Sequence, residues 1–201
     1  GLPLAWWLTF QRRRWTFLVE AVVALPLVLP PTVLGFYVLV GMGPGSPLGR
    51  AWTALTGHGL AFTFEGLVLA SLLYSLPFVV QPIAASFAQI DPEIIEAAST
   101  LGASSWRTFT RIAIPMARDG VLAGAVLGFA HTLGEFGVVL MVGGNLPGVT
   151  RTVSISIYDQ VQALDFASAN RTALLLLAVS IAALSLVYGI LRKPWAVAPS
   201  A

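Results

Sequence analysis

Four long apolar runs, over residues 17–40, 60–80, 121–142 and 173–191, constrain this chain more than any other feature. A helix needs about 20 apolar residues to cross the hydrocarbon core of a bilayer. Composition agrees, because 57% of the residues are hydrophobic and 10% are charged, against about 25% charged in a soluble domain. The runs lack the alternation of an outer-membrane barrel, so helices are required. We therefore predict an all-α integral membrane protein.

The first residues form a shorter apolar run, GLPLAWWLTF, which leads directly into Arg12, Arg13 and Arg14. This run of about ten residues is too short to span a bilayer. A secretory signal peptide would carry its basic residues before the apolar run, not after it. We therefore expect this run to be the last turns of a spanning helix. The whole of residues 1–201 is then predicted to be one N-terminally incomplete domain of five helices, of which the first is truncated.

The basic residues sort by side of the membrane, as the positive-inside rule requires. Eight fall on the side that carries the 81–120 loop and the C-terminus, and three on the other. This distribution predicts that the 81–120 loop and the C-terminus are in the cytoplasm and that the turn-rich 41–59 and 143–170 loops face outward. Within the 143–170 loop, a short helix over 160–169 is an alternative to irregular structure. The cytoplasmic group is Arg12, Arg13, Arg14, Arg107, Arg111, Arg118, Arg192 and Lys193; the outer group is Arg50, Arg151 and Arg171.

The 81–120 segment is longer than a connection between spans needs to be. Asp91-Pro92-Glu93 is a helix-start signal, with an acid at the N-cap, proline at the first helical position and a second acid in the first turn. Gly102 fits the end of this helix. A second short helix is predicted over 105–112, ended by Pro115. We expect these two helices to present a polar face to a partner, and Trp106 to contact either that partner or the membrane-embedded body.

The same segment carries the spacing E-A-A, three residues, G, nine residues, I, x, hydrophobic, P. This pattern resembles the EAA loop of ABC importer permeases, although isoleucine stands at one position where leucine is commoner. The resemblance implies a type I ABC importer transmembrane subunit whose 81–120 loop docks in a cleft of the ATP-binding subunit. The ATPase-coupling residues that it implies are Glu96, Ala97, Ala98, Gly102, Ile112, Ile114 and Pro115.

Residues 25–39, 60–71 and 129–158 further resemble the molybdate permeases of bacteria. The turn GNLPGVT over 144–150 is similar to the G-N-I-P-G-x-T turn of that group, whereas LGEFG over 133–137 also occurs in sulfate permeases. Val138 and Val139 stand where Ala and Thr are usual, and His131 stands where Arg is usual. A positive residue at position 131 would favour a nearby anion, so the histidine weakens the expectation that this position binds substrate.

The resemblance implies a homodimer of this chain in the bacterial cytoplasmic membrane, two ATP-binding cassette subunits and a periplasmic molybdate-binding protein. No P-loop, GxxxxGK[ST], is present, so ATP and Mg would act on the partner subunit and this chain would not be an enzyme. We expect no bound cofactor, no metal site, no catalytic residue and no nucleic-acid partner. Tungstate or sulfate is the alternative substrate, and a multi-span membrane enzyme or a passive channel is the alternative class.

Four residues are candidates for the pathway or its gate. Pro30 and Pro31 interrupt the 17–40 run, where each removes a backbone donor and bends the helix, and Thr32 beside them carries a hydroxyl. Glu135 lies in the third run, where an unpaired charge is costly. For Glu135 we favour packing or gate structure over direct contact with an anion, because like charges repel. The small residues of the third run, Ala123, Gly124, Gly128 and Gly134, predict close helix packing, either within the chain or at a dimer seam.

Overall fold

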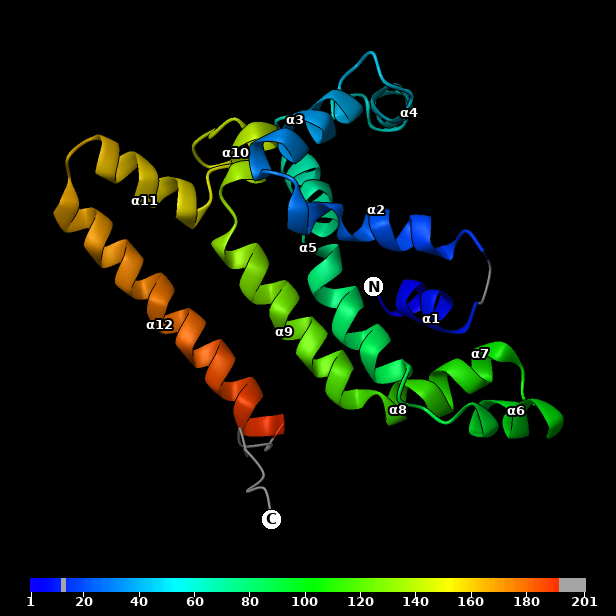
Figure 1. The fold of residues 1–201 in the computed structure, drawn as a ribbon. Coiled ribbons are helices and arrows are strands. Elements are labelled where there is room, and N and C mark those ends of the chain that lie inside the picture. The colour runs from blue at the N-terminus through cyan, green and yellow to red at the C-terminus, as the bar shows by residue number, and fades with distance from the viewer. Residues whose placement is uncertain (12–13, 192–201) are drawn as a thin grey trace.

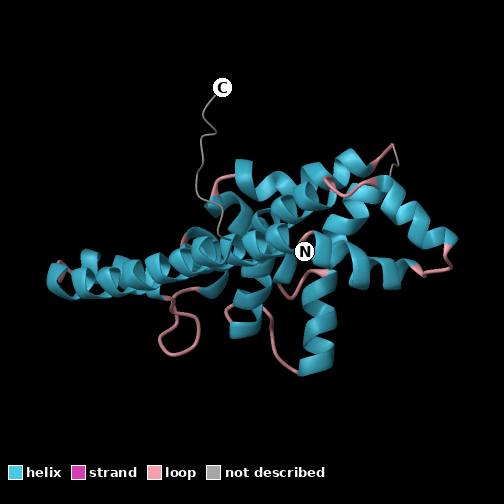
Figure 2. Cartoon of the chain, turned by 90° about the horizontal axis from the view of Figure 1, so that it is seen from below, coloured by secondary structure: helices cyan, strands magenta, loops and turns pink. Residues whose placement is uncertain are grey.

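The computed structural model describes residues 1–11 and 14–191, and every regular element in them is a helix (Figures 1 and 2). The predicted all-α fold is thereby confirmed. Arg12, Arg13, Arg192 and Lys193, four of the residues that predicted orientation, lie outside the described residues. The elements are α1 (Leu2–Phe10), α2 (Thr16–Val28), α3 (Pro31–Met42), α4 (Pro47–Thr56), α5 (Phe64–Phe87), α6 (Pro92–Thr100), α7 (Ser105–Thr108), the π-helix η1 (Phe109–Ala113), α8 (Ile114–Met116), α9 (Arg118–Gly134), α10 (Gly137–Gly143), α11 (Val153–Gln162) and α12 (Phe166–Leu191).

Two described helices are each long and apolar enough to cross a membrane, α5 and the 166–186 part of α12. Two further candidates are bent pairs. One joins α2 and α3 with a bend of 120°, and the other joins the 105–116 segment to α9 with a bend of 80°. Counting each bent pair as one span gives up to four spans, the number of full spans predicted from the apolar runs. The third run is nevertheless interrupted, because α9 ends at Gly134 and α10 begins at Gly137.

The 17–40 run is two helices, and the interruption falls at the prolines that predicted a bend there. Helix α2 ends at Val28, and Leu29 is extended, with φ −75° and ψ 139°. The cause is local, because a residue that precedes proline is pushed out of the helical region. Pro30 is extended as well, and Pro31 begins α3 at a position where its missing N–H does no harm.

The most extensive contact of the fold is between α5 and α9, which run side by side in Figure 1. Glycines on α9 make this approach possible. A Cβ atom added at Gly120 would lie 2.6 Å from the carbonyl oxygen of Pro82, and one added at Gly124 would lie 2.8 Å from that of Val79. The small-residue face of α9 is therefore used within the chain at Gly124, which was one of the two predicted alternatives. Gly134 is not part of this face, since nothing lies within 4 Å of its Cβ position.

Three buried clusters hold the helices together. The largest joins α1, α2, α5 and the η1–α8 region, and the second joins α3, α5 and α10. A third, smaller cluster of Leu67, Val139 and Ile155 connects α5, α10 and α11. Helix α12 contributes little to these clusters, and 6% of its most apolar window is buried. Most of its surface is therefore available to lipid or to another protein chain.

The two loops predicted to face outward each contain a helix. Helix α4 was not predicted, and α11 (Val153–Gln162) begins earlier than the alternative helix predicted over 160–169. Ser46 caps α4 by accepting a hydrogen bond of 2.8 Å from the Gly49 N–H, and Gly57, with φ +81°, ends it. Thr152 caps α11 by accepting a 3.3 Å hydrogen bond from the Ile155 N–H. These loops were predicted as loops because glycine and proline are frequent in them, but here the same residue types mark helix ends.

Candidate functional site

The predicted coupling segment begins with α6, and local hydrogen bonds close both of its ends. Asp91 accepts a hydrogen bond of 3.0 Å from the first turn of the helix. At the other end the N–H of Ala103 donates to the carbonyl of Ala98, and that of Gly102 donates to the carbonyl of Ser99, both at 3.0 Å. These paired bonds form a Schellman motif, in which glycine takes the left-handed position, and Gly102 has φ +77°. The predicted start and end of this helix are both confirmed.

The second helical stretch, over 105–116, consists of α7, η1 and α8 in succession. Ser104 begins it by accepting a 3.3 Å hydrogen bond from the Arg107 N–H. Pro115 does not end the helix as predicted, because α8 runs to Met116 and the chain bends only before α9. The wider π turn of η1 precedes the proline and alters the hydrogen-bond ladder at the point where proline has no N–H to contribute.

The residues predicted to couple to an ATPase differ in how far they are exposed on this two-helix segment. Glu96, Ala97, Gly102 and Pro115 are exposed, Ile112 and Ile114 are half-buried, and Ala98 is buried. Two large apolar side chains are exposed beside them, since Leu101 is 87% exposed and Trp106 is 70% exposed. The segment occupies the same end of the molecule as the end of α12, whereas α4 and α10 lie at the other end (Figure 1). Exposed apolar groups rimmed by charge are typical of a protein-binding surface.

An aromatic cluster ties the segment to the membrane-embedded helices. The ring of Phe109 in η1 lies 5.5 Å from that of Trp6 in α1 and 6.4 Å from that of Phe87 in α5. Trp6 also contacts Phe87, at 5.6 Å in an edge-to-face arrangement. Aromatic pairs at these separations attract one another beyond the area that they bury. The coupling segment is therefore packed against both α1 and α5.

The structure brings the two sets of predicted pathway residues together. The break between α2 and α3 packs on the break between α9 and α10, since a Cβ atom at Gly137 would lie 2.6 Å from the Cβ of Pro31. Farther along the same helix pair, a Cβ at Gly35 would lie 2.9 Å from that of Met141. Pro30, Pro31 and Thr32 are exposed next to this contact. Two helix interruptions thus meet at one level of the bundle.

Glu135 occupies the second of these interruptions and is 7% exposed. Its Oε1 atom accepts a hydrogen bond of 2.8 Å from the backbone N–H of Val138, in the first turn of α10. A carboxylate at a helix N-terminus satisfies an otherwise unpaired donor and complements the helix dipole. The carboxylate is thus positioned to hold the start of α10, as favoured in the sequence interpretation.

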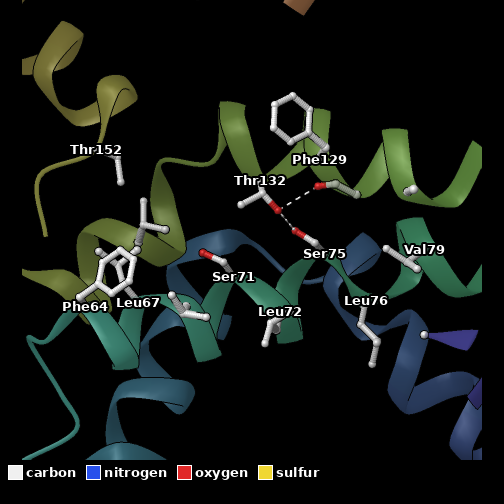
Figure 3. Close-up of a pocket in the computed structure, with 15 residues that line it drawn as sticks. Phe64, Leu67, Ser71, Leu72, Ser75, Leu76, Val79, Phe129, Thr132 and Thr152 are labelled. Atoms are coloured by element: carbon white, nitrogen blue, oxygen red, sulfur yellow. Dashed lines mark hydrogen bonds between the residues drawn. The ribbon is translucent and has the colours of Figure 1, made fainter. Parts of the chain in front are cut away.

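A groove of about 550 Å³ follows the face formed by α5 and α9 (Figure 3). Most of its lining is apolar, but four hydroxyl groups also face it, those of Ser71, Ser75, Thr132 and Thr152. The hydroxyls of Ser75 and Thr132 are 2.7 Å apart and join the two helices. The sequence interpretation did not single out Ser75 or Thr132. The i, i+4 spacing of Ser71 and Ser75 in the apolar central part of α5 was the available signal for Ser75.

The GNLPGVT turn between α10 and α11 is closed by side-chain hydrogen bonds. The Asn145 amide donates to both carboxylate oxygens of Asp159 at 3.1 and 2.9 Å, and Arg151 Nε donates to Asn145 Oδ1 at 2.9 Å. Inside the turn, Thr150 Oγ1 donates to the Gly143 carbonyl at 2.6 Å. Gly144 and Asn145 have positive φ, +68° and 56°. The residues that carry the resemblance to molybdate permeases in this region are thus those that define its shape.

In residues 1–11 and 14–191, no group of three or more His, Asp or Glu side chains is arranged to hold a metal ion. Residues 1–193 match the family model described as binding-protein-dependent transport system inner membrane component. The chain is 56% identical over 170 residues to the molybdenum transport system permease protein ModB of Azotobacter vinelandii, covering 85% of this chain and 75% of that protein.

Two more distant similarities point the same way. The chain is 33% identical over 181 residues to the sulfate transport system permease protein CysT of Escherichia coli, covering 90% of this chain and 65% of that protein. Its fold matches a bacterial ABC transporter involved in alginate import with a TM-score of 0.73 at 16% identity, over 97% of this chain and 72% of that one. The chain belongs to the family of binding-protein-dependent transport system inner membrane components, the permease subunits of ABC importers.

Proposed function

We propose that this chain is the permease subunit of an ATP-driven importer that moves molybdate across the bacterial cytoplasmic membrane by alternating access. The observation that carries the proposal is the 56% identity to a molybdenum transport permease over most of both chains. Identity to the molybdenum permeases of Haemophilus influenzae and Escherichia coli is 41% and 39%. The sulfate permease is at 33%, so molybdate is favoured over sulfate. Tungstate has the same shape and charge as molybdate and is the closest competitor.

The geometry supports coupling through residues 88–117, the part of the predicted 81–120 loop that lies between the end of α5 and the start of α9. Its two helices are closed by their own caps and expose Glu96, Leu101 and Trp106 at one end of the bundle. We propose that this surface docks on the ATP-binding cassette subunit, with Ala97, Ala98, Gly102, Ile112, Ile114 and Pro115 shaping it. ATP hydrolysis is assigned to that partner, because this sequence has no P-loop. The aromatic cluster around Phe109 gives the segment a route to the spans.

The proposed assembly contains two copies of this chain, two ATP-binding subunits and a periplasmic molybdate-binding protein. A solved alginate transporter of similar fold was crystallised with a periplasmic protein carrying an alginate pentasaccharide. We propose that the 88–117 segment faces the cytoplasm and that the C-terminus is on the same side, because Arg107 and Arg111 lie in this segment and Arg118 directly follows it. The α10–α11 turn then faces the binding protein. Pro30, Pro31, Thr32 and Glu135 would border the pathway where the two helix interruptions meet.

Substrate choice is tested by uptake into proteoliposomes that contain the chain with its ATPase, supplied with the binding protein. We expect ATP-dependent uptake of radiolabelled molybdate that excess tungstate inhibits and excess sulfate inhibits weakly. Equal inhibition by sulfate would overturn the molybdate assignment and leave the permease assignment intact. Uptake that proceeds without ATP would instead support a passive channel.

Coupling is tested with Glu96→Lys and Gly102→Pro, measured by co-purification with the ATPase and by transport. Both should lose transport, because the first reverses an exposed charge on α6 and the second replaces a residue held at φ +77°. Glu65→Lys is the control, since Glu65 is also an exposed acid on a helix, at the start of α5 and outside the 88–117 segment. Unchanged ATPase binding and transport in both test variants would contradict the docking assignment.

A further inference from the structure

Helix α4 lies across the end of the bundle that is opposite the coupling segment, and the proposed function gives it no role. Figure 1 shows α4 almost end-on, whereas α5 and α9 are seen from the side. In the sequence it connects two candidate spans, because α3 ends at Met42 and α5 begins at Phe64. A helix that lies crosswise where spans end follows the bilayer surface and does not cross the bilayer.

Short hydrogen bonds hold α4 against the last turn of α3. The Ser46 hydroxyl donates to the Gly41 carbonyl at 2.5 Å and accepts from the Gly49 N–H at 2.8 Å. The Ser46 N–H also donates to the Gly43 carbonyl at 3.0 Å. Residues 43–46 are all that separate the two helices, and each residue spans at most about 3.6 Å. The start of α4 is therefore fixed at the level where the span that contains α3 ends.

One face of α4 packs on the body of the subunit. Side chains three or four residues apart lie on the same face of a helix, and Gly49 and Trp52 form such a pair. Gly49 is buried, and Trp52 packs against the buried cluster that contains Met42 and Leu60. The orientation of α4 about its own axis is therefore determined, and its other faces point away from this contact.

A second face of α4, which we call the apolar face, is exposed. It consists of Leu48, Ala51 and Leu55, which follow one another at helical spacing. Leu48 is 48% exposed and Leu55 is 84% exposed. The remaining face carries Arg50 and Thr53, which are also exposed. An apolar face beside a polar, basic one is the pattern of helices that lie in a membrane interface.

Three observations indicate that lipid covers the apolar face of α4. The face lies at the level of a span end, where lipid is the surrounding medium. Helix α3, to which α4 is hydrogen-bonded, also exposes large apolar side chains, since Phe36 is 50% exposed and Tyr37 is 65% exposed. The sequence of α4 contains one basic residue, Arg50, and no acid, which suits the phosphate groups of anionic lipids.

We propose that α4 is an interfacial helix that binds the bilayer surface, with its apolar face among the acyl chains and Arg50 at the lipid phosphates. The partner is thus a lipid surface, and the proposal does not depend on which ion is transported. Because Ser46 bonds α4 to the last turn of α3, the contact with lipid also sets the depth of α3 in the bilayer. The end of α3 that lies away from the helix break at Pro30 is thereby held at the membrane surface.

The test reads the surroundings of single positions, which is possible because the chain contains no cysteine. Leu48→Cys, Leu55→Cys and Thr53→Cys are each labelled with the fluorophore NBD, and the complex with the ATPase is placed in vesicles of phosphatidylcholine and phosphatidylglycerol. A nitroxide attached to the lipid near its headgroup should quench the labels at positions 48 and 55 about twofold more than the label at position 53. Iodide in the water should quench them in the opposite order. Leu175→Cys, at a 64% exposed position of α12, is the reference on a membrane-spanning helix.

Thr53→Cys is the matched control, because Thr53 is exposed on the same helix, and labelling of the unmodified complex measures the background from the partner subunits. Two positions on the apolar face keep the test valid if one labelled variant does not assemble. Equal lipid quenching at positions 53 and 55 would overturn the proposal.

Two other results would also overturn it. Loss of lipid quenching at positions 48 and 55 when the periplasmic binding protein is added would make that protein the occupant of the apolar face. Protection of both positions from both quenchers would assign the face to another protein chain. These readouts do not measure transport, so each of these results leaves the proposed function as it stands.

Discussion

The carboxylate of Glu135 accepts a hydrogen bond of 2.8 Å from the backbone N–H of Val138 and so holds the first turn of α10. Glu135→Gln keeps an oxygen at that position, whereas Glu135→Ala leaves the N–H unpaired. We expect the alanine variant to lose about 1 kcal/mol of stability, the usual effect of removing a helix cap, and the glutamine variant to lose less. Thermal unfolding in detergent micelles measures both. Equal stability of the two variants would show that the hydrogen bond does not hold α10.

The contact of α9 with α5 should not tolerate a side chain at Gly124. A Cβ atom there would lie 2.8 Å from the carbonyl oxygen of Val79, and backbone cannot move aside as a flexible side chain can. Gly124→Ala should therefore destabilise the protein by about 1–3 kcal/mol, the usual range for overpacking.

The matched control for this contact is Gly134→Ala, on the same helix with nothing within 4 Å of its Cβ position. It should change stability by less than about 0.5 kcal/mol. Unfolding of the two purified variants under the same conditions gives the comparison. A Gly124→Ala protein as stable as the Gly134→Ala protein would mean that the helices are not in close contact at this level.

Gly102 ends α6 with φ +77°, a conformation that costs an ordinary L-residue about 1–2 kcal/mol. Gly102→Ala should therefore open α6 more often, and Gly102→Asn should do so less, because asparagine adopts this conformation more readily. Hydrogen exchange of the α6 amides reports this local opening. Faster exchange in the asparagine variant than in the alanine variant would contradict the assigned role of the backbone conformation.

The bond between Asn145 and Asp159 links the start of the α10–α11 turn to α11. Because Arg151 contacts both side chains, Asn145→Ala and Asp159→Ala should each weaken the same network. A double-mutant cycle should then give a coupling of about 0.5–1 kcal/mol, as expected for a partly exposed network. Fully additive effects would indicate that the two side chains act independently.

Asp165 precedes α12 and accepts a hydrogen bond of 3.0 Å from the Ser168 N–H. Hydrogen bonds from the side chain and backbone of Ser168 lower the pKa of the Asp165 carboxyl. Because the pKa of Asp165 is lower in the folded state, the ionised carboxylate stabilises the helix start at pH values above the ordinary carboxyl pKa. This stabilisation is lost as the pH falls through the folded-state pKa. Amide exchange in the first turn of α12 should accelerate on acidification from about pH 6 to about pH 3, and Asp165→Asn should weaken that dependence.

Local signals predicted the parts of this structure that local hydrogen bonds determine. Helix α6 was located because Asp91, Pro92 and Gly102 act within a few residues of one another. The break at Leu29 and Pro30 was foreseen as a bend in one span, but its size of 120° depends on what α3 packs against. The break at Glu135 has no proline to announce it. It exists because the carboxylate caps a new helix and Gly137 packs on Pro31, which lies more than one hundred residues earlier.

The residues of the candidate site also differ in whether local sequence signals could predict them. The coupling residues form one contiguous pattern, so their spacing alone suggested a role. His131 was noted only because arginine is usual at its position. Its contact with Ser75, 56 residues away, was not predicted, because nothing in the spacing of the two residues connects them. Only the pairing of α5 with α9 brings the imidazole next to the hydroxyl.

The glycine contacts between α5 and α9 also restrict how this subunit can change shape. A carbonyl oxygen of α5 lies within 3 Å of the place that a Cβ on α9 would occupy, so the two backbones are in close contact. We therefore expect the two helices to move as one unit, with η1 in contact with one end of that unit through Phe87 and Phe109. We expect any hinging at the two helix breaks beside Pro30 and Glu135, which pack on each other through Pro31 and Gly137.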